Sequence, residues 1–231
     1  MANSTNTEAA VTIEQTLNKQ ETIFLKYRKQ VIAAVAAVII IIAGVTAYKT
    51  FYSAPREDKA ATALAKAQEA FNQGDFKKAL NGDKTQEGFL AIADSYSMTD
   101  AANLANLYAG LCYAQDGKWQ EAVKYLEEFS TKSDAMISPA ATAALGNAYA
   151  NTGDIDKAIS TLKKAAEMAD SKAPEGVSNS LAPTFLIQAG RLLESQNKKS
   201  EALEVYKDVK KKYINSSASM DIDKYIERVS E

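Results

Sequence analysis

The sequence contains no histidine, and cysteine occurs once in its 231 residues, at Cys112. Histidine is the commonest general base and metal ligand, so its absence excludes Ser-His and Cys-His catalytic arrangements. A single cysteine cannot form an intramolecular disulfide bond. Cys112 lies in a helical pattern between Gly110 and Tyr113, which favours a buried core thiol over a nucleophile.

The sequence also lacks an excess of charge of either sign. It contains 27 Lys and Arg and 29 Asp and Glu, so the net charge is −2. With 46% hydrophobic residues, the chain can build a core and has no polyelectrolyte character, which argues against nucleic acid as a partner. Acidic residues such as Asp94 and Asp100 lie near expected helix ends, where solvated caps are common. We therefore predict a non-enzymatic protein without a cofactor, a metal site or a small-molecule substrate.

One long apolar run is present, from Val31 to Ala47, and it contains no charged residue. About 17 residues is the lower limit for a helix that crosses the hydrocarbon core of a bilayer. Lys26, Arg28 and Lys29 precede the run, whereas the basic residues after it are interspersed with acidic ones. The positive-inside rule then places the N-terminus in the cytoplasm and the remainder of the chain outside it.

The apolar run organises the expected layout of the chain. The expected segments are a cytoplasmic tail with a juxtamembrane helix (1–30), a transmembrane helix (31–48), a linker that Pro55 interrupts (49–59), a helical solenoid (60–214) and a capping helix (215–231). A cleaved signal peptide is an alternative, since Val45-Thr46-Ala47 resembles a cleavage site, although the segment before the run is long for one. A buried soluble helix is disfavoured because the run has no polar face.

A spacing of small residues recurs after the apolar run. A glycine is followed seven residues later by a turn residue, and five residues after that by an alanine. The three sets are Gly110, Gly117 and Ala122; Gly146, Gly153 and Ala158; and Gly190, Asn197 and Ala202. Small residues on facing helical positions let two backbones approach closely, and glycine or asparagine suits the left-handed turn that ends a first helix. The spacing therefore predicts paired antiparallel helices.

These residues resemble the tetratricopeptide repeat (TPR), a helix-turn-helix unit of about 34 residues. Tyr113 and Tyr149 follow their glycines at the aromatic position of that motif, and a degenerate first repeat carries an insertion over 81–88. The resemblance implies an all-α solenoid of about four helix pairs that binds other proteins. A longer connection is expected over 171–182, and 215–231 is expected to cap the last pair.

In TPR proteins the first helices line an inner groove, and the resemblance transfers that role to nine positions. They are Leu104, Leu107, Tyr108, Leu111, Asn147, Asn151, Gln188, Arg191 and Glu194. For Leu104, Leu107 and Leu111, packing against the preceding repeat is an equally weighted interpretation. Of the polar residues that some TPR cochaperones use to grip a carboxylate terminus, only Asn147 is present, so we expect extended segments or a folded surface as the ligand.

The whole layout also resembles the single-pass, TPR-containing ancillary subunits of the bacterial Sec translocon. That resemblance implies a protein of the cytoplasmic (inner) membrane whose repeat domain lies in the periplasm. Its partners would be translocon components, folding factors or secreted chains, and its role would be that of an adaptor or chaperone-like subunit. A membrane-tethered scaffold for envelope assembly or cell division is the alternative.

Overall fold

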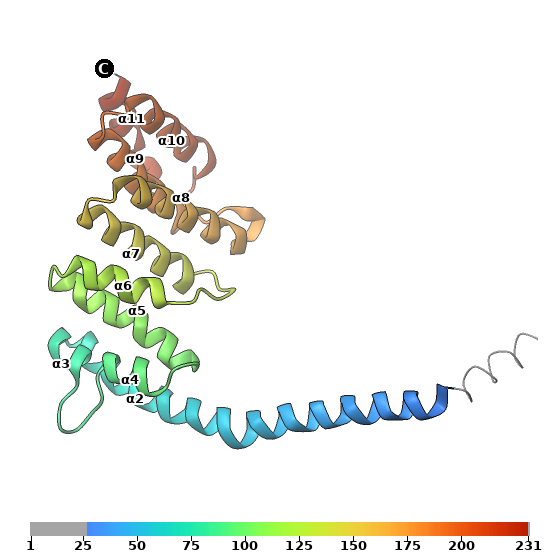
Figure 1. Cartoon of the computed structure of the whole chain (residues 1–231). Coiled ribbons are helices and arrows are strands. Elements are labelled where there is room, and N and C mark those ends of the chain that lie inside the picture. The colour runs from blue at the N-terminus through green and yellow to red at the C-terminus, as the bar shows by residue number, and fades with distance from the viewer. Residues whose placement is uncertain (1–26, 231) are drawn as a thin grey trace, which may run out of the picture. The chain divides into compact units, whose positions relative to one another are not determined.

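The computed structural model describes residues 27–230, and the expected tail and juxtamembrane helix lie largely outside that range. The chain divides into two compact units, Met1–Pro55 and Arg56–Glu231. Figure 1 shows the helices of the second unit stacked in chain order from α2 to α11. Each unit is described on its own below.

The first unit is helical over residues 27–48 and continues into a π-helical turn, η1 (Lys49–Ser53). The apolar window within this helix has a mean hydropathy of 2.7, and none of it is buried. Residues 49–59 are therefore helical, which differs from the expected linker. Proline cannot continue the regular hydrogen-bond ladder, and the π turn before Pro55 shifts the bonding so that the Ala54 N–H donates to Lys49 O.

The second unit consists of antiparallel helix pairs, as the spacing of small residues predicts. Pair 1 is α2 (Ala54–Asn72) with the short helices α3 (Phe76–Asn81) and α4 (Phe89–Ser95). The other pairs are α5 (Asp100–Gln115) with α6 (Trp119–Glu128), α7 (Ile137–Thr152) with α8 (Ile155–Lys172), and α9 (Ala182–Ser195) with α10 (Lys199–Lys212). The described residues form no strand; one isolated β-bridge joins Gly82 and Glu87.

Short elements complete the solenoid between and after the pairs. The 3-10 turns η2 (Pro174–Gly176) and η3 (Ser217–Met220) lie in the connections, and α11 (Ile222–Ser230) follows the last pair. Ile222 and Val229 of α11 are buried in the same cluster as Tyr206 and Val209 of α10. The amphipathic helix α11 thus covers the apolar side of the last pair, which confirms the all-α solenoid with a C-terminal cap.

Each of the three later pairs is closed by a glycine of the first helix against a large side chain of the second. A Cβ atom added to the glycine would lie 2.6 Å from Leu126 at Gly110, 2.9 Å from Leu162 at Gly146 and 2.4 Å from Tyr206 at Gly190. Real Cβ atoms do not approach other atoms so closely, so only glycine allows this helix spacing. The alanines Ala122, Ala158 and Ala202 on the second helices are fully buried.

The turns within all four pairs share one hydrogen-bonding pattern. Gly74, Gly117, Gly153 and Asn197 adopt positive φ values of 80°, 72°, 92° and 58°. In each turn this residue donates its N–H to the carbonyl three residues earlier, and the next residue donates to the carbonyl five residues earlier. These two hydrogen bonds form the Schellman motif, which satisfies the last carbonyls of a helix. The expected equivalence of Asn197 with the turn glycines is confirmed.

The fold predicts a specific sensitivity at Gly190. In the variant Gly190→Ala, the new methyl group would collide with the fully buried ring of Tyr206. Overpacking of this kind costs about 1–3 kcal/mol, and the higher helix propensity of alanine offsets about 1 kcal/mol of it. We expect a lower melting temperature for the detergent-solubilised chain, measured by circular dichroism. Thr184→Ala, an exposed change on the same helix, is the control, and equal melting of the two variants would contradict the packing.

Candidate functional site

Four of the nine predicted groove residues lie on α5, where the structure gives them packing roles. Leu107 is only 7% exposed and belongs to a core cluster, and Leu104 and Leu111 are partly buried against it. The Tyr108 ring stacks on Phe89 of α4, with 5.1 Å between the ring centroids. The packing interpretation of Leu104, Leu107 and Leu111 is therefore favoured, and the apolar end of the predicted groove is filled from within the chain.

The polar middle of the predicted groove lies on α7 and α9. Arg191 is exposed and Asn147 is partly exposed, and neither side chain forms a hydrogen bond or ion pair with another described residue. The side-chain amide of Asn151 donates to the Asn147 carbonyl at 2.8 Å. Gln188 has a buried Oε1 without a hydrogen-bond partner among the described residues. Asn147 and Arg191 are thus the two polar members most available to a ligand.

Glu194, the last predicted groove residue, binds the capping helix instead. Its carboxylate accepts hydrogen bonds from both Nε and Nη2 of Arg228 in α11, each at 2.7 Å, and from the Tyr206 hydroxyl. The hydrogen bond from Arg228 lowers the pKa of Glu194, aided by Tyr206 and opposed by burial. Burial and the bond to Glu194 raise the pKa of Tyr206. Glu194 therefore joins α9, α10 and α11.

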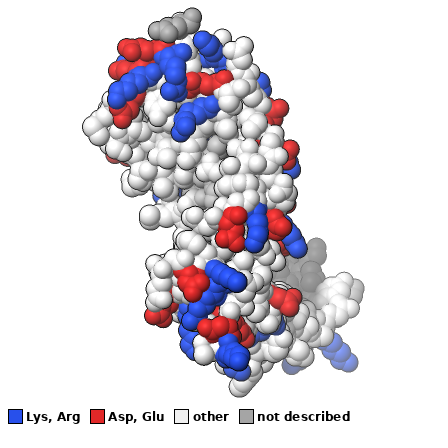
Figure 2. Space-filling model, turned by 90° about the vertical axis from the view of Figure 1, so that its left-hand side faces the viewer, with Lys and Arg blue, Asp and Glu red and all other residues white. Residues whose placement is uncertain are grey.

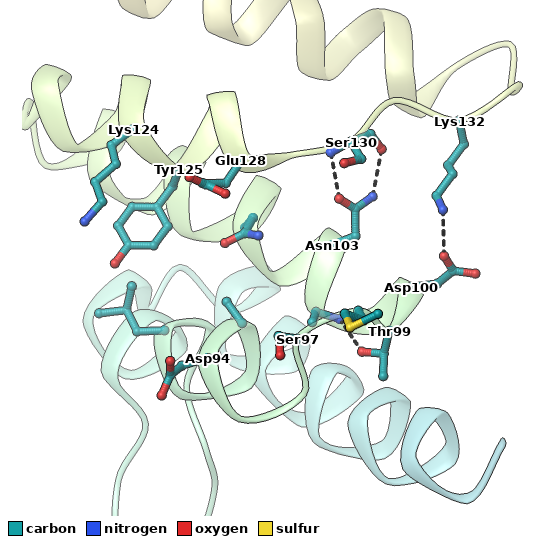
Figure 3. A pocket seen from close by; sticks show the side chains of 15 residues that line it. Asp94, Ser97, Thr99, Asp100, Asn103, Lys124, Tyr125, Glu128, Ser130 and Lys132 are labelled. Atoms are coloured by element: carbon teal, nitrogen blue, oxygen red, sulfur yellow. Dashed lines mark hydrogen bonds and ion pairs between the residues drawn. The ribbon is translucent and has the colours of Figure 1, made fainter. Parts of the chain in front are cut away.

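Three hollow surfaces of the solenoid lie elsewhere, in furrows between successive second helices. A cavity of about 500 Å³ lies between α4 and α6, where Asp94, Asn106, Tyr125 and Glu128 line it. Figure 3 shows Tyr125 and Glu128 above this space and Asp94 below it. The carboxylates of Asp94 and Glu128 form no hydrogen bond or ion pair with other described residues. At the far side of the cavity, Asn103 exchanges two hydrogen bonds with the Ser130 backbone (Figure 3).

Two further furrows continue this face, which we call the second-helix face. A cavity of about 560 Å³ lies between α6 and α8, where the Tyr149 hydroxyl donates to Glu127. Burial and this bond raise the pKa of Tyr149 to about 12. A cavity of about 610 Å³ lies between α8 and α10, where buried Asp170 accepts hydrogen bonds from the Tyr213 hydroxyl at 2.6 Å and the Lys212 ammonium at 2.5 Å.

Sequence reasoning missed this second-helix face. The repeat spacing marks the buried positions, and the residues that border the furrows are ordinary exposed ones such as Lys124 and Glu128. These exposed positions follow no repeat pattern, so the sequence contains no direct indication of a binding surface there. Only the stacking of the pairs shows that they border a cavity.

Charge and reactive groups do not define a catalytic centre in the described part of the chain. Figure 2 shows acidic and basic side chains interspersed over the visible face, without a broad patch of one sign. No group of three or more carboxylate or thiol side chains that could hold a metal ion occurs among the described residues. Burial, with the nearby Asp116 charge, raises the pKa of the Cys112 thiol to about 12, so it stays protonated.

Comparison with known families identifies the architecture. A family model described as "Tetratricopeptide repeat-like domain" matches residues 22–223, which is most of the chain. The protein belongs to this tetratricopeptide repeat-like family. No curated protein matches the chain at a significant level.

Solved structures support the same fold. The chain resembles the nearly identical TPR-like repeats assigned to a Podosopora anserina kinesin light chain, with a TM-score of 0.58 and 14% identity over 75% of this chain and 86% of that one. A single-substitution variant of that protein gives a TM-score of 0.57 and 13% identity, over 75% and 85% of the two chains. At these identities the likeness shows the fold alone.

The Glu194 contacts predict a pH-dependent attachment of the capping helix. Because its folded pKa is lowered, Glu194 stabilises the fold above the ordinary glutamate pKa of about 4.3, and this contribution is lost as pH falls through the folded pKa. Glu194→Gln should cost about 1 kcal/mol at pH 7, a low value for charged hydrogen bonds because Arg228 is half exposed.

Thermal unfolding of the wild type and Glu194→Gln across pH 3–7 would measure this effect. We expect the difference between their melting temperatures to shrink towards the acid end. Glu204→Gln, at an exposed site on α10, is the matched control. A difference that stays constant with pH would show that the carboxylate charge plays no part.

Proposed function

We propose that the protein is a membrane-anchored interaction module whose repeat domain lies outside the cytoplasm and binds other proteins. The observation that carries this proposal is the extent of the family match, which begins at residue 22 and therefore includes the apolar helix together with the repeats. The helix and the solenoid are thus parts of one recurring unit. Such a unit fits a protein that presents a binding scaffold beside a membrane.

The retained anchor is favoured over a cleaved signal peptide for a physical reason. Helical structure continues without interruption through residues 44–55, across the site at Ala47 where cleavage would occur. Signal peptidases act on extended segments after short apolar stretches, and the helix here is long and apolar enough to cross a bilayer. The basic residues before the span favour a cytoplasmic N-terminus.

Within this proposal, the partner lies near the Sec translocon, and the protein acts there as an adaptor or chaperone-like subunit. The polar middle of the groove around Asn147 and Arg191 supports binding to extended or partly unfolded chains, whose exposed backbone groups need hydrogen-bond partners. A flexible arginine beside an amide can serve many sequences. An adaptor for translocated chains needs this tolerance more than it needs a deep specific pocket.

The topology can be tested by adding a protease to spheroplasts that express the chain with an N-terminal tag. We expect the repeat domain to be degraded while a fragment with the tag and the apolar helix survives, because the bilayer shields both. Permeabilised spheroplasts, in which the tag is lost as well, are the control. Survival of the intact chain in sealed spheroplasts would overturn the proposed orientation.

The partner and the binding surface can be tested in one crosslinking experiment on native membranes. The double variant Asn147→Ala and Arg191→Ala should recover several-fold less of the Sec channel and its folding factors than the wild type. Lys124→Ala with Glu128→Ala, on the second-helix face, is the matched control and should recover normal amounts. The reverse result would move the site to the furrows, and recovery of cell-wall or division proteins without the channel would favour the envelope scaffold.

A further inference from the structure

Among the described residues of the second unit, the large exposed apolar side chains lie in the connections between helix pairs and in the connection from α10 to α11. They are Met98, Met136, Ile137, Ile214 and Met220, with exposed fractions between 49% and 97%. They lie in or directly beside the connections 96–99, 129–136 and 213–221. The turns within the pairs, by contrast, contain Gly, Asn, Asp, Lys and Gln residues at positions such as Gly117 and Asn197.

These connections form one edge of the solenoid, which we call the inter-pair edge. Every helix pair reverses the chain direction, so the connections between pairs all lie opposite the tight turns. Hydrogen bonds link them along the edge. Lys132 in one connection pairs with Asp100 at the start of α5 at 2.9 Å, and Asp170 holds both Ser178 and Tyr213 of the next two connections, at 2.8 and 2.6 Å. The exposed apolar side chains therefore lie along one braced edge, and the 173–181 connection is the one that carries none of them.

The chain enters the repeat domain at this same edge. Arg56 donates to the Ser95 carbonyl at 2.9 Å, and Glu57 accepts the backbone N–H groups of Asp100 and Ala101 at 2.8 and 2.9 Å. Both contacts flank the 96–99 connection that carries Met98. Tyr52, an aromatic residue of the kind that anchors at a membrane interface, is four residues from Arg56, which limits their separation to about 14 Å.

Three of the apolar residues have a strained or hydrogen-bonded backbone. Met98 is 97% exposed and has a φ of 71°. This left-handed conformation is disfavoured for residues other than glycine, asparagine and aspartate. The Asp134 carboxylate accepts the N–H groups of Met136 and Ile137 at 3.0 and 2.6 Å, which fixes the start of α7. A strained or braced backbone that presents an apolar side chain to solvent indicates a binding role rather than a folding role.

Ion pairs neutralise some of the charges at this edge, and basic and acidic residues occur there in similar numbers. Lys132 pairs with Asp100, and Lys224 pairs with Asp221 at 2.5 Å. The surface that this edge offers to a partner is therefore apolar and has little net charge. That chemistry matches the boundary between lipid headgroups and acyl chains, into which methionine and isoleucine side chains can insert without a requirement for anionic lipid.

We infer that the inter-pair edge contacts the surface of the bilayer in which the chain is anchored, with Met136, Ile137 and Met220 inserted at the interface. This inference rests on the membrane anchoring under the proposed function. The edge is adjacent to the entry of the chain from the span, so the tether itself supplies a high local concentration of lipid. Each insertion needs only a weak affinity when the domain cannot diffuse away.

Site-specific fluorescence in liposomes of neutral phosphatidylcholine, with the full-length chain reconstituted, tests the contact. Variants with one added cysteine, Met136→Cys and Met220→Cys, carry an environment-sensitive dye, and two sets of lipids, spin-labelled near the headgroup or deep in the acyl chain, quench it by contact. Gln73→Cys and Lys199→Cys, exposed beside the tight turns, are the matched controls. Ile40→Cys, in the apolar helix, reports insertion of the anchor. The wild type measures background labelling of Cys112, which is buried.

We expect a blue-shifted emission and a loss of intensity by quenching at Met136→Cys and Met220→Cys, and water-like emission without quenching at the two turn positions. Quenching of the Ile40→Cys dye alone would overturn the inference and leave the anchor intact. Absence of quenching at Ile40→Cys as well would overturn both. Equal quenching at both edges would show nonspecific collapse onto lipid, and shielding only in native membranes would assign the edge to a protein partner; either result contradicts the inference.

Discussion

The close approach of two helices at a glycine is the constraint on which the rest of the solenoid depends. Gly110, Gly146 and Gly190 leave room for Leu126, Leu162 and Tyr206 to lie directly against the partner backbone. Because the helices of a pair are so close, the chain must reverse within a short left-handed turn. The alanines beyond the turn are then fully buried, and the pairs stack into continuous clusters. Helix spacing, turn geometry and core composition are one linked requirement.

This linkage explains which features the sequence could predict. Glycine positions and turn residues are local requirements, so Asn197 could be recognised from its place in the spacing alone. The contact of Glu194 with Arg228 joins residues of separate helices, and the furrows exist only after the pairs stack, so no local pattern indicates them. Proline usually ends a helix, so Pro55 indicates a break in a linker, whereas a π turn before it keeps these residues helical.

The same geometry gives the two edges of the solenoid different chemical freedom. At the tight-turn edge, the Schellman motif requires one left-handed residue in each turn, a position that disfavours large side chains. The connections between pairs are longer and carry no such requirement, so their composition is free to serve binding. Met98 and Met220 are exposed on these connections, and the described tight turns carry no large exposed apolar side chain. This difference is expected when only one edge has a partner.

The capping helix and the inter-pair edge together limit where a protein ligand can bind. The first-helix face is closed at one end by the packing of Tyr108 on Phe89, and at the other Glu194 is occupied by Arg228. An open polar stretch remains around Asn147 and Arg191. This stretch lies on the first-helix face, whereas the second-helix furrows reach the inter-pair edge, where Met98 and Lys132 line one of them. Contact of the inter-pair edge with lipid would therefore leave the polar stretch around Asn147 and Arg191 in water, while it would cover one end of the furrows.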